Sequence, residues 1–172
     1  MEDKILIVDK QDNVLGEEGK AKCHEGDGIL HRAFSAFIFN EKNELLLQKR
    51  SGLKPLWPLH WSNTCCSHPR KGESYEQAAE RRIKEELGID CRPELLFKFQ
   101  YSAKYKDIGS ENELCAVLVG KCSKDIKINI DPKEIAEFKF VSIDELKNDI
   151  KENPDNYTPW FKMEIKRVLE NL

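Results

Sequence analysis

The chain has 172 residues, of which 40% are hydrophobic and 34% charged, and its formal net charge is −3. This length suits one domain with a core of its own, and the composition is that of a globular protein. The slight negative charge excludes general attraction to nucleic acid, and apolar runs such as residues 33–39 are far too short to cross a bilayer. Because no basic and apolar leader follows Met1, we expect a cytoplasmic protein without a nucleic-acid or membrane partner.

The N-terminal third of the chain predicts strands joined by loops. Residues 5–8 form a short apolar strand, and the polar, glycine-punctuated residues 16–28 predict a loop. The apolar and aromatic residues 31–39 predict a strand covered on both faces, and residues 45–49 predict its partner after a turn. Residues 50–71 then form a long irregular segment.

A helix follows this segment. Ser74 and Gln77 have the spacing of a capping box, and Gly88 marks the helix end after Leu87. Arg82 and Glu86, four residues apart, place a cation beside a carboxylate on one edge of the helix. The buried stripe has the same four-residue spacing and consists of Ala79, Ile83 and Leu87.

The C-terminal half adds strands and two helices. Strands are predicted at residues 95–101, 112–120 and 137–141, with a loop over residues 104–110 between the first two. A second capping box at Ser142 opens a helix that ends near Lys151, and Pro159 is at the favoured first position of a terminal helix over residues 159–171. The pattern predicts a single α+β domain with a mixed sheet flanked by helices.

Reactive side chains are concentrated between Trp57 and Pro69. Cys66 and His68 lie there, and such chemistry in an irregular segment indicates a functional loop. Cys66 could be a small buried apolar residue, could pair with Cys65, or could act as an acid/base or nucleophilic thiol. All six cysteines are expected to be reduced, since no secretion signal or C-x-x-C pair is present, and the sequence positions are Cys23, Cys65, Cys66, Cys91, Cys115 and Cys122.

Metal ligands are the second candidate feature. Glu111 and Glu113 are two residues apart on a predicted strand, so their carboxylates share a face. Together with His24, His31 and His68 they would suit Mn²⁺ or Zn²⁺. Taken singly, however, each histidine is more often structural, and the two glutamates could form a solvated strand edge.

Basic and aromatic residues allow two interpretations as well. Lys20, Arg50, Lys54 and Arg82 could be scattered surface charges or could surround a phosphorylated ligand, in which case Glu86 would hold Mg²⁺ against the phosphate. Tryptophans are most often core residues, but an indole face can also stabilise a cation in a dry pocket. The candidates are Trp57, Trp61 and Trp160.

Residues 67–89 resemble a degenerate Nudix box, G-x5-E-x7-R-E-U-x-E-E-x-G-U, where U is a bulky aliphatic residue. Ser67 replaces the opening glycine, and Arg82 replaces the glutamate that follows the central arginine. Nudix hydrolases use that glutamate in their metal cluster, so its loss argues against diphosphate hydrolysis. The positions that match are Glu73, Arg81, Glu85, Glu86, Gly88 and Ile89.

These departures, and landmarks from about residue 20 to the terminal helix, resemble type I isopentenyl diphosphate isomerase. The landmarks are His24, His31, Trp57-Pro58, Trp61-Ser62-Asn63, Cys66-Ser67-His68-Pro69, Arg81-Arg82, Glu111-Asn112-Glu113 and Tyr157-Thr158-Pro159-Trp160. The resemblance implies a Nudix-type mixed sheet sandwiched by helices, one domain over residues 1–172, with the loop 16–28 and the helix 159–171 completing the active site. It also implies reversible conversion of isopentenyl to dimethylallyl diphosphate through a tertiary carbocation, in isoprenoid biosynthesis, by an enzyme expected to be a monomer.

Residue roles follow from the same resemblance. Cys66 and Glu113 match the catalytic positions. Tyr101 matches the tyrosine beside the glutamate, and Tyr105 is a weaker candidate for that position. Trp160 matches the indole near the reacting carbons. The metal site that would hold Mn²⁺ or Zn²⁺ comprises His24, His31, His68, Glu111 and Glu113, and Glu86 meets Mg²⁺ on the diphosphate. The diphosphate itself is bound by Lys20, Arg50, Lys54, Ser67 and Arg82.

Two other functions remain open at this point. A Nudix hydrolase would release phosphate from a nucleoside or prenyl diphosphate. A non-catalytic module would use Cys65, Cys66, His68 and His31 as structural zinc ligands, although structural zinc usually shows closely paired ligands at two places in a chain.

Overall fold

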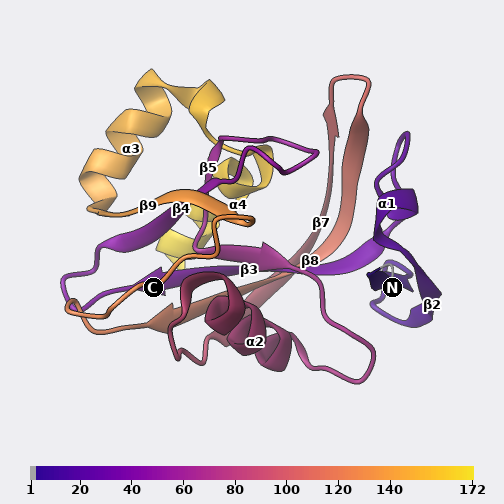
Figure 1. The fold of residues 1–172 in the computed structure, drawn as a ribbon, viewed down its shortest axis with the longest axis horizontal. Helices are drawn as coiled ribbons and strands as arrows, with labels where there is room; N and C mark the ends of the chain where they lie inside the picture. The colour runs from indigo at the N-terminus through magenta and orange to yellow at the C-terminus, as the bar shows by residue number, and fades with distance from the viewer. Residues whose placement is uncertain (1–2) are drawn as a thin grey trace.

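A mixed sheet of nine strands forms the centre of the molecule, and a computed structural model describes it through residues 3–172 (Figure 1). Helices cover both faces of this sheet. In chain order the elements are β1 (Lys4–Val8), β2 (Val14–Gly19), α1 (Lys20–Cys23), β3 (His31–Phe39), β4 (Leu45–Arg50), β5 (Trp61–Ser62), β6 (Cys65–Ser67), α2 (Tyr75–Leu87), β7 (Glu94–Tyr105), β8 (Gly109–Lys121), β9 (Ile135–Val141), α3 (Ile143–Glu152), the 3₁₀ turn η1 (Pro154–Asn156) and α4 (Pro159–Glu170). The predicted α+β class is confirmed.

Strand β3 organises the sheet. It pairs in parallel with β8 and antiparallel with the short β6, while β7 and β8 form a long antiparallel hairpin. The predicted β3–β4 partnership is correct only next to the turn, where Phe39 opposes Leu45. Most of β4 pairs instead with β9. The two strands diverge after the turn, which leaves β3 free to accept β6 on that edge.

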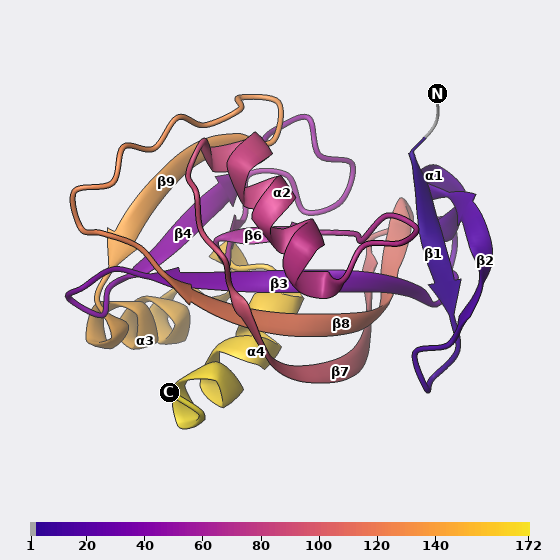
Figure 2. The same ribbon diagram turned by 90° about the horizontal axis from the view of Figure 1, so that it is seen from below.

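Two hydrophobic cores lie on opposite faces of the sheet. Along β3, Phe37 and Phe39 pack toward α3 and α4, whereas Ala36 and Ile38 pack toward α2. Figure 2 shows α2 on one side of the strands and α3 and α4 on the other. The strand is therefore apolar on both faces, as its sequence predicts.

Helix α2 has the predicted ends. The side chain of Ser74 accepts a hydrogen bond from the Gln77 backbone, the reciprocal bond is present, and Gly88 ends the helix in the left-handed conformation at φ 71°. Such a cap typically contributes about 0.5–2 kcal/mol. The predicted stripe of Ala79, Ile83 and Leu87 is fully buried. Helices α3 and α4 also begin where the sequence predicts, and α4 ends at Glu170.

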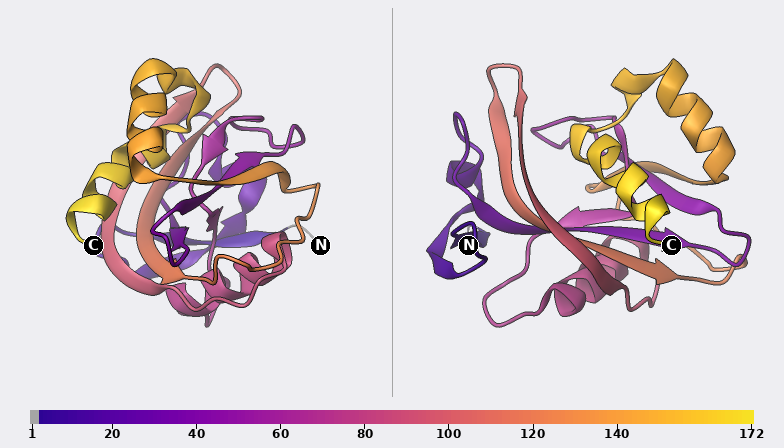
Figure 3. Two further views of the ribbon diagram at one scale, coloured as in Figure 1. Left: turned by 90° about the vertical axis from the view of Figure 1, so that its left-hand side faces the viewer. Right: turned by 180° about the vertical axis from the view of Figure 1, so that it is seen from behind.

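Two loop predictions are wrong. The segment 16–28 is not a loop throughout, because β2 runs to Gly19 and α1 occupies Lys20–Cys23. The backbone of β1 stabilises β2 as an exposed strand whose glycines and glutamates give no strand signal of their own. The expected loop at residues 104–110 is also too long, since the β7–β8 hairpin continues to Tyr105 and resumes at Gly109. Figure 3 shows this hairpin extending well beyond the body of the sheet.

The helices of residues 3–172 are all too short or too polar to span a bilayer.

Candidate active site

Alternation along the strands places the candidate residues on one face of the sheet. His31 and Ser35 on β3 point to the same side, and the sheet registers set Cys66 opposite Ser35 and Glu113 beside His31. Val117 of β8, four residues after Glu113, belongs to the core beneath α4. These side chains therefore face the C-terminal helix rather than α2.

A cavity of about 480 Å³ opens on this face. Predicted residues from distant parts of the chain line its wall: Lys20, His24, Arg50, Lys54, Cys66, Ser67, His68, Tyr101, Glu111, Glu113 and Trp160. Three predicted residues, His31, Arg82 and Glu86, are not part of that wall. His31 lies fully buried beneath it.

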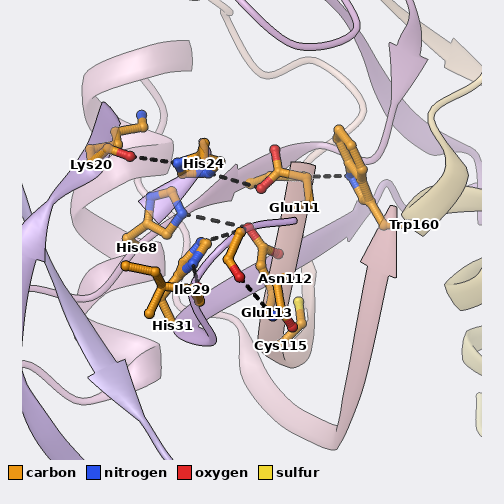
Figure 4. Close-up of polar contacts among 12 residues, drawn as sticks. Lys20, His24, Ile29, His31, His68, Glu111, Asn112, Glu113, Cys115 and Trp160 are labelled. Carbon is orange, nitrogen blue, oxygen red and sulfur yellow. Dashed lines mark hydrogen bonds and ion pairs between the residues drawn. The ribbon is translucent and has the colours of Figure 1, made fainter. Parts of the chain in front are cut away.

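Three imidazoles and Glu113 form a group of potential metal ligands. One ligand atom from each of His24, His31, His68 and Glu113 lies within 4.8 Å of the others. Figure 4 shows these side chains gathered together, with Glu111 next to His24. His24 is the C-cap residue directly after helix α1, and its Nδ1 lies 2.7 Å from the carbonyl oxygen of Lys20, four residues earlier.

Unmatched hydrogen-bonding atoms indicate that this group fits a cation. His31 Nδ1 lies 2.7 Å from the Ile29 carbonyl oxygen, so that nitrogen carries the proton and Nε2 offers a lone pair. His31 Nε2 and His68 Nε2 are each 3.5 Å from Glu113 Oε1, and both nitrogens are buried without a hydrogen-bond partner. Burial and the nearby His31 lower the pKa of His68 well below its usual value, which keeps the ring neutral. Neutral imidazoles and a carboxylate suit Mn²⁺ or Zn²⁺.

Glu113 is held by Tyr101. The Tyr101 hydroxyl donates to Glu113 Oε2 at 2.7 Å, and the two residues are directly opposite each other on β7 and β8. Burial would raise the pKa of Glu113, but the neighbouring His31 and the hydrogen bond from Tyr101 outweigh it and leave that pKa lowered. Tyr105, the weaker rival, instead packs against Trp57 at 5.0 Å between ring centroids.

Cys66 has four polar neighbours that the sequence does not identify as a set. Its Sγ donates to Asn63 Oδ1 at 2.8 Å and accepts from Trp160 Nε1 at 3.2 Å. The Ser35 and Ser62 hydroxyls lie 3.8 and 3.9 Å away. Burial raises the pKa of Cys66 to about 12, so the sulfur is a thiol at neutral pH.

The thiols are free, as predicted. Cys65 is fully buried in the core beneath α2, on the opposite face of the sheet from Cys66. Neighbouring residues in a strand point to opposite sides, so β6 turns these two sulfurs apart. A Cys65–Cys66 pair is therefore ruled out as an explanation for the motif.

Trp160 forms part of the wall beside Cys66. Its indole packs edge-on against Trp57, with ring centroids 5.3 Å apart, and the guanidinium carbon of Arg50 lies 5.2 Å from the Trp160 ring centroid. The backbone carbonyls of Leu56 and Trp57 accept hydrogen bonds from Arg50 and fix its position. Trp61 lies apart from this arrangement, with Lys49 and Lys139 over its ring.

Behind Lys54, charged residues form a continuous network. Glu134 joins Lys54 to Arg82, and Arg82 also donates to Glu86 Oε1 at 2.6 Å. Burial opposes ionisation of Glu134, but Lys54 and Arg82 lower its pKa to about 2. Nothing in the sequence points to Glu134, because a single glutamate between Lys133 and Ile135 carries no motif. The network couples Arg82 and Glu86 to the edge of the cavity.

The chain is similar to known proteins over nearly its whole length. The NUDIX domain model matches residues 29–161. The chain is 44% identical to isopentenyl-diphosphate Delta-isomerase 1 of Photorhabdus laumondii, covering 98% of this chain and 96% of the relative. It is 42% identical to isopentenyl-diphosphate Delta-isomerase 1 of Aromatoleum aromaticum, with 98% and 94% covered. The plant isopentenyl-diphosphate Delta-isomerase I of Camptotheca acuminata is 38% identical, with 98% and 81% covered.

Solved structures support the fold. The structure of DR0079 from Deinococcus radiodurans has a TM-score of 0.67 at 20% identity, covering 88% of this chain and 90% of that one. A MutT protein from Methanosarcina mazei has a TM-score of 0.63 at 21% identity, covering 80% and 91%. These likenesses concern the fold alone. Fold and sequence together show that the chain belongs to the isopentenyl-diphosphate Delta-isomerase family, within the proteins that carry a NUDIX domain.

Proposed function

We propose that this protein is an isopentenyl-diphosphate Delta-isomerase that interconverts isopentenyl and dimethylallyl diphosphate. One observation carries the proposal: the Cys66 thiol and the Glu113 carboxyl line the same cavity, next to an indole. Moving this double bond needs a proton donor at one carbon and a proton acceptor at another. Two titratable groups in one small pocket supply both.

The reaction starts with transfer of a proton to the terminal alkene carbon, C4, which leaves a tertiary carbocation at C3. Removal of a proton from C2 then forms the new double bond, so the substrate gains and loses one proton. Cys66 is one of the two groups and Glu113, held by Tyr101, is the other. The enzyme ends each turnover with these two protonation states exchanged, which suits a reversible reaction.

Trp160 protects the cationic intermediate. An indole face attracts a cation through its quadrupole, and the attraction is stronger away from water. The indole N–H is already bonded to Cys66 and to Ser62 Oγ at 3.1 Å, so the ring is fixed beside the sulfur. Trp57, Leu56 and Trp160 are all at least nine-tenths buried, and their apolar surface keeps water from trapping the cation.

The cations at the cavity bind the diphosphate. Lys20, Arg50 and Lys54 reach the cavity together with Ser67, whose backbone adds a donor. Arg82 and Glu86 act one step behind them through Glu134. We propose that Glu86 holds Mg²⁺ on the diphosphate, with Arg82 beside it.

The imidazole group and Glu113, with Glu111 beside His24, would hold Mn²⁺ or Zn²⁺. Such an ion would fix the Glu113 carboxylate and tune its acidity. We further propose that the working enzyme is a cytoplasmic monomer, that residues 1–172 act as one catalytic domain, and that α1 and α4 complete its active site. Its partner is a prenyl diphosphate substrate.

A proton NMR time course in D₂O tests the function. Isopentenyl diphosphate and Mg²⁺ are incubated with the wild type, with Cys66→Ala and with Cys122→Ala, in which the replaced thiol is not part of the cavity lining. The wild type and Cys122→Ala should form deuterium-labelled dimethylallyl diphosphate, and Cys66→Ala should be slower by about 10²-fold or more. Release of inorganic phosphate or diphosphate instead would refute isomerisation, and equal rates for Cys66→Ala would refute the role of the thiol.

A further inference from the structure

Glu164 is a buried carboxyl group that the reaction outlined above does not use. It lies on α4 one helical turn after Trp160, on the same face, and is 1% exposed. Within residues 3–172, no cation forms an ion pair with it, and its Oε2 has no hydrogen-bond partner. A buried carboxylate without a counter-charge is costly, so this side chain needs an explanation.

Its neighbours connect Glu164 to the active site. Cys115 Sγ lies 3.6 Å from Glu164 Oε1 and 3.5 Å from Ser35 Oγ, so this thiol links the carboxyl group to the Ser35 hydroxyl. Ser35 lines the cavity, where its Oγ lies 3.8 Å from Cys66 Sγ. Cys115 and Ser35 therefore lie in succession between Glu164 and the sulfur of Cys66.

The surroundings of Glu164 favour its uncharged form. Burial raises its pKa well above the usual value, and the negative charge of Glu113 adds to this effect. The other titratable groups close to it, Cys115 and Cys66, provide no positive charge. A protonated carboxyl group has one O–H donor and one carbonyl acceptor.

Two of the neighbours of Cys66 are fixed in their hydrogen-bonding roles. The Asn63 amide nitrogen donates to the carbonyl oxygens of Ala36 and Cys65, so Asn63 Oδ1 faces the sulfur and can only accept. The Trp160 N–H can only donate. Neither partner can adjust when the sulfur gains or loses a proton during turnover.

The Ser35 hydroxyl is different, because it can donate to a sulfur lone pair or accept from the thiol. It can reverse in this way only if its second neighbour can also donate or accept. That second neighbour is the Cys115 thiol, and a protonated Glu164 on the other side of this thiol can donate to it or accept from it without any change of net charge.

We propose that Glu164 is a positioning residue that acts through Cys115 to orient the Ser35 hydroxyl toward the sulfur of Cys66. This inference rests on the proposed function. It assigns to Glu164 no proton transfer to the substrate, only the alignment of a hydroxyl whose misplacement slows the reaction step.

Steady-state kinetics with isopentenyl diphosphate test the proposal on Glu164→Gln, Glu164→Met and, as a matched control on the same helix, Glu170→Gln, where the side chain is exposed. Glutamine keeps a donor and an acceptor, so Glu164→Gln should keep kcat within about threefold of the wild type. Methionine keeps the size but neither role, and should lower kcat by about tenfold or more with KM unchanged. Glu170→Gln should match the wild type.

A double-mutant cycle separates positioning from general damage to the fold. Ser35→Ala should lower kcat to the same extent as Glu164→Met, and the double variant should be no slower than either. Near-ultraviolet circular dichroism shows whether the tryptophan environment is intact. Three results would each overturn the proposal. The first is a wild-type kcat in Glu164→Met, and the second is a Glu164→Gln variant as slow as Glu164→Met. The third is a double variant whose loss in kcat equals the product of the two single losses.

Infrared spectroscopy of the resting protein checks the charge state without turnover. The wild-type-minus-Glu164→Gln difference spectrum at neutral pH should contain the C=O stretching band of a protonated carboxylic acid. A carboxylate band in its place would overturn the inference even if the enzyme is an active isomerase. Absence of any wild-type turnover would instead refute the proposed function and leave the infrared result to stand.

Discussion

His24 Nε2 lies 2.9 Å from Glu111 Oε2, while the other ring nitrogen, Nδ1, faces the backbone carbonyl oxygen of Lys20. With the ring proton on Nδ1, two acceptors face each other across the remaining contact. Glu111 Oε2 is also buried without a hydrogen-bond partner. A second proton on the His24 ring or a bound cation would remove the conflict with Glu111, and a bound cation would do the same for His31 and His68 against Glu113.

This relationship predicts tight, histidine-dependent metal binding. We expect one Mn²⁺ or Zn²⁺ per chain to raise the unfolding temperature of metal-depleted wild type, because the ion binds only the folded arrangement. His68→Ala should not bind the ion, and its unfolding temperature should not rise when the metal is added. The control is His60→Asn, since His60 is the histidine outside the group and bonds to the Pro58 carbonyl. Elemental analysis and thermal unfolding measure both effects, and equal metal content in wild type and His68→Ala would contradict the assignment.

The hydrogen bond between Tyr101 and Glu113 gives a second prediction. Tyr101→Phe removes the hydroxyl and keeps the ring that stacks on Phe99 at 5.4 Å. We expect kcat to fall by about tenfold, the effect of one well-placed hydrogen bond to a charged group, with little change in KM. Tyr105→Phe is the matched control on the same strand, and it should keep the wild-type kcat. The reverse ranking of the two variants would move the role to Tyr105.

The position of Lys54 predicts an effect on substrate binding rather than on the chemical step. Lys54→Met should raise KM for isopentenyl diphosphate by about tenfold, because a charge-assisted contact to the diphosphate is lost. Lys71→Met, at an exposed lysine outside the cavity lining, should leave KM unchanged. Initial rates at several substrate concentrations give KM and kcat for both variants, and the measurement is repeated at higher salt. A loss in kcat alone would argue against a binding role for Lys54.

Local signals in the sequence predict most of the fold. The capping boxes at Ser74 and Ser142 predict the starts of α2 and α3, and the continuous apolar and aromatic run predicts the strand that begins at His31. Spacing also predicts that Glu111 and Glu113 share a face. Strand pairing depends on contacts far apart in the chain, so the partnership of β4 with β9 and the exposed β2 carry no local signal.

The sequence likewise predicts some residues of the candidate site and gives no signal for others. Cys66, His68 and Glu113 lie in recognisable motifs, and the cavity brings them together. Glu134 and Glu164 have no motif, because their surroundings come from the tertiary fold. Glu164 in particular is an ordinary polar residue in an amphipathic helix until α4 is placed over β3 and β8.

The buried acid at Glu164 also predicts how stability changes with pH. Its pKa is raised in the folded protein above the ordinary glutamate value of 4.5, so above that value the unfolded chain loses this proton while the folded protein keeps it. The folded state then binds more protons, and stability falls as pH rises, by up to about 1.4 kcal/mol per pH unit, until the folded pKa is passed. The contribution is fully present only below the unfolded pKa.

Glu164→Gln removes this term because glutamine does not titrate. We therefore expect the free energy of unfolding of the variant, relative to the wild type, to increase steadily between about pH 5 and pH 7.5, a range below the ionisation of unfolded thiols. The histidines titrate in both proteins, so they cancel in the difference. Urea unfolding, followed by tryptophan fluorescence at a series of pH values, measures this difference in the free energy of unfolding. Glu170→Gln is the control at an exposed position. If the wild-type and Glu164→Gln curves run parallel across this range, Glu164 is not a buried neutral acid, and its role beside Ser35 fails with it.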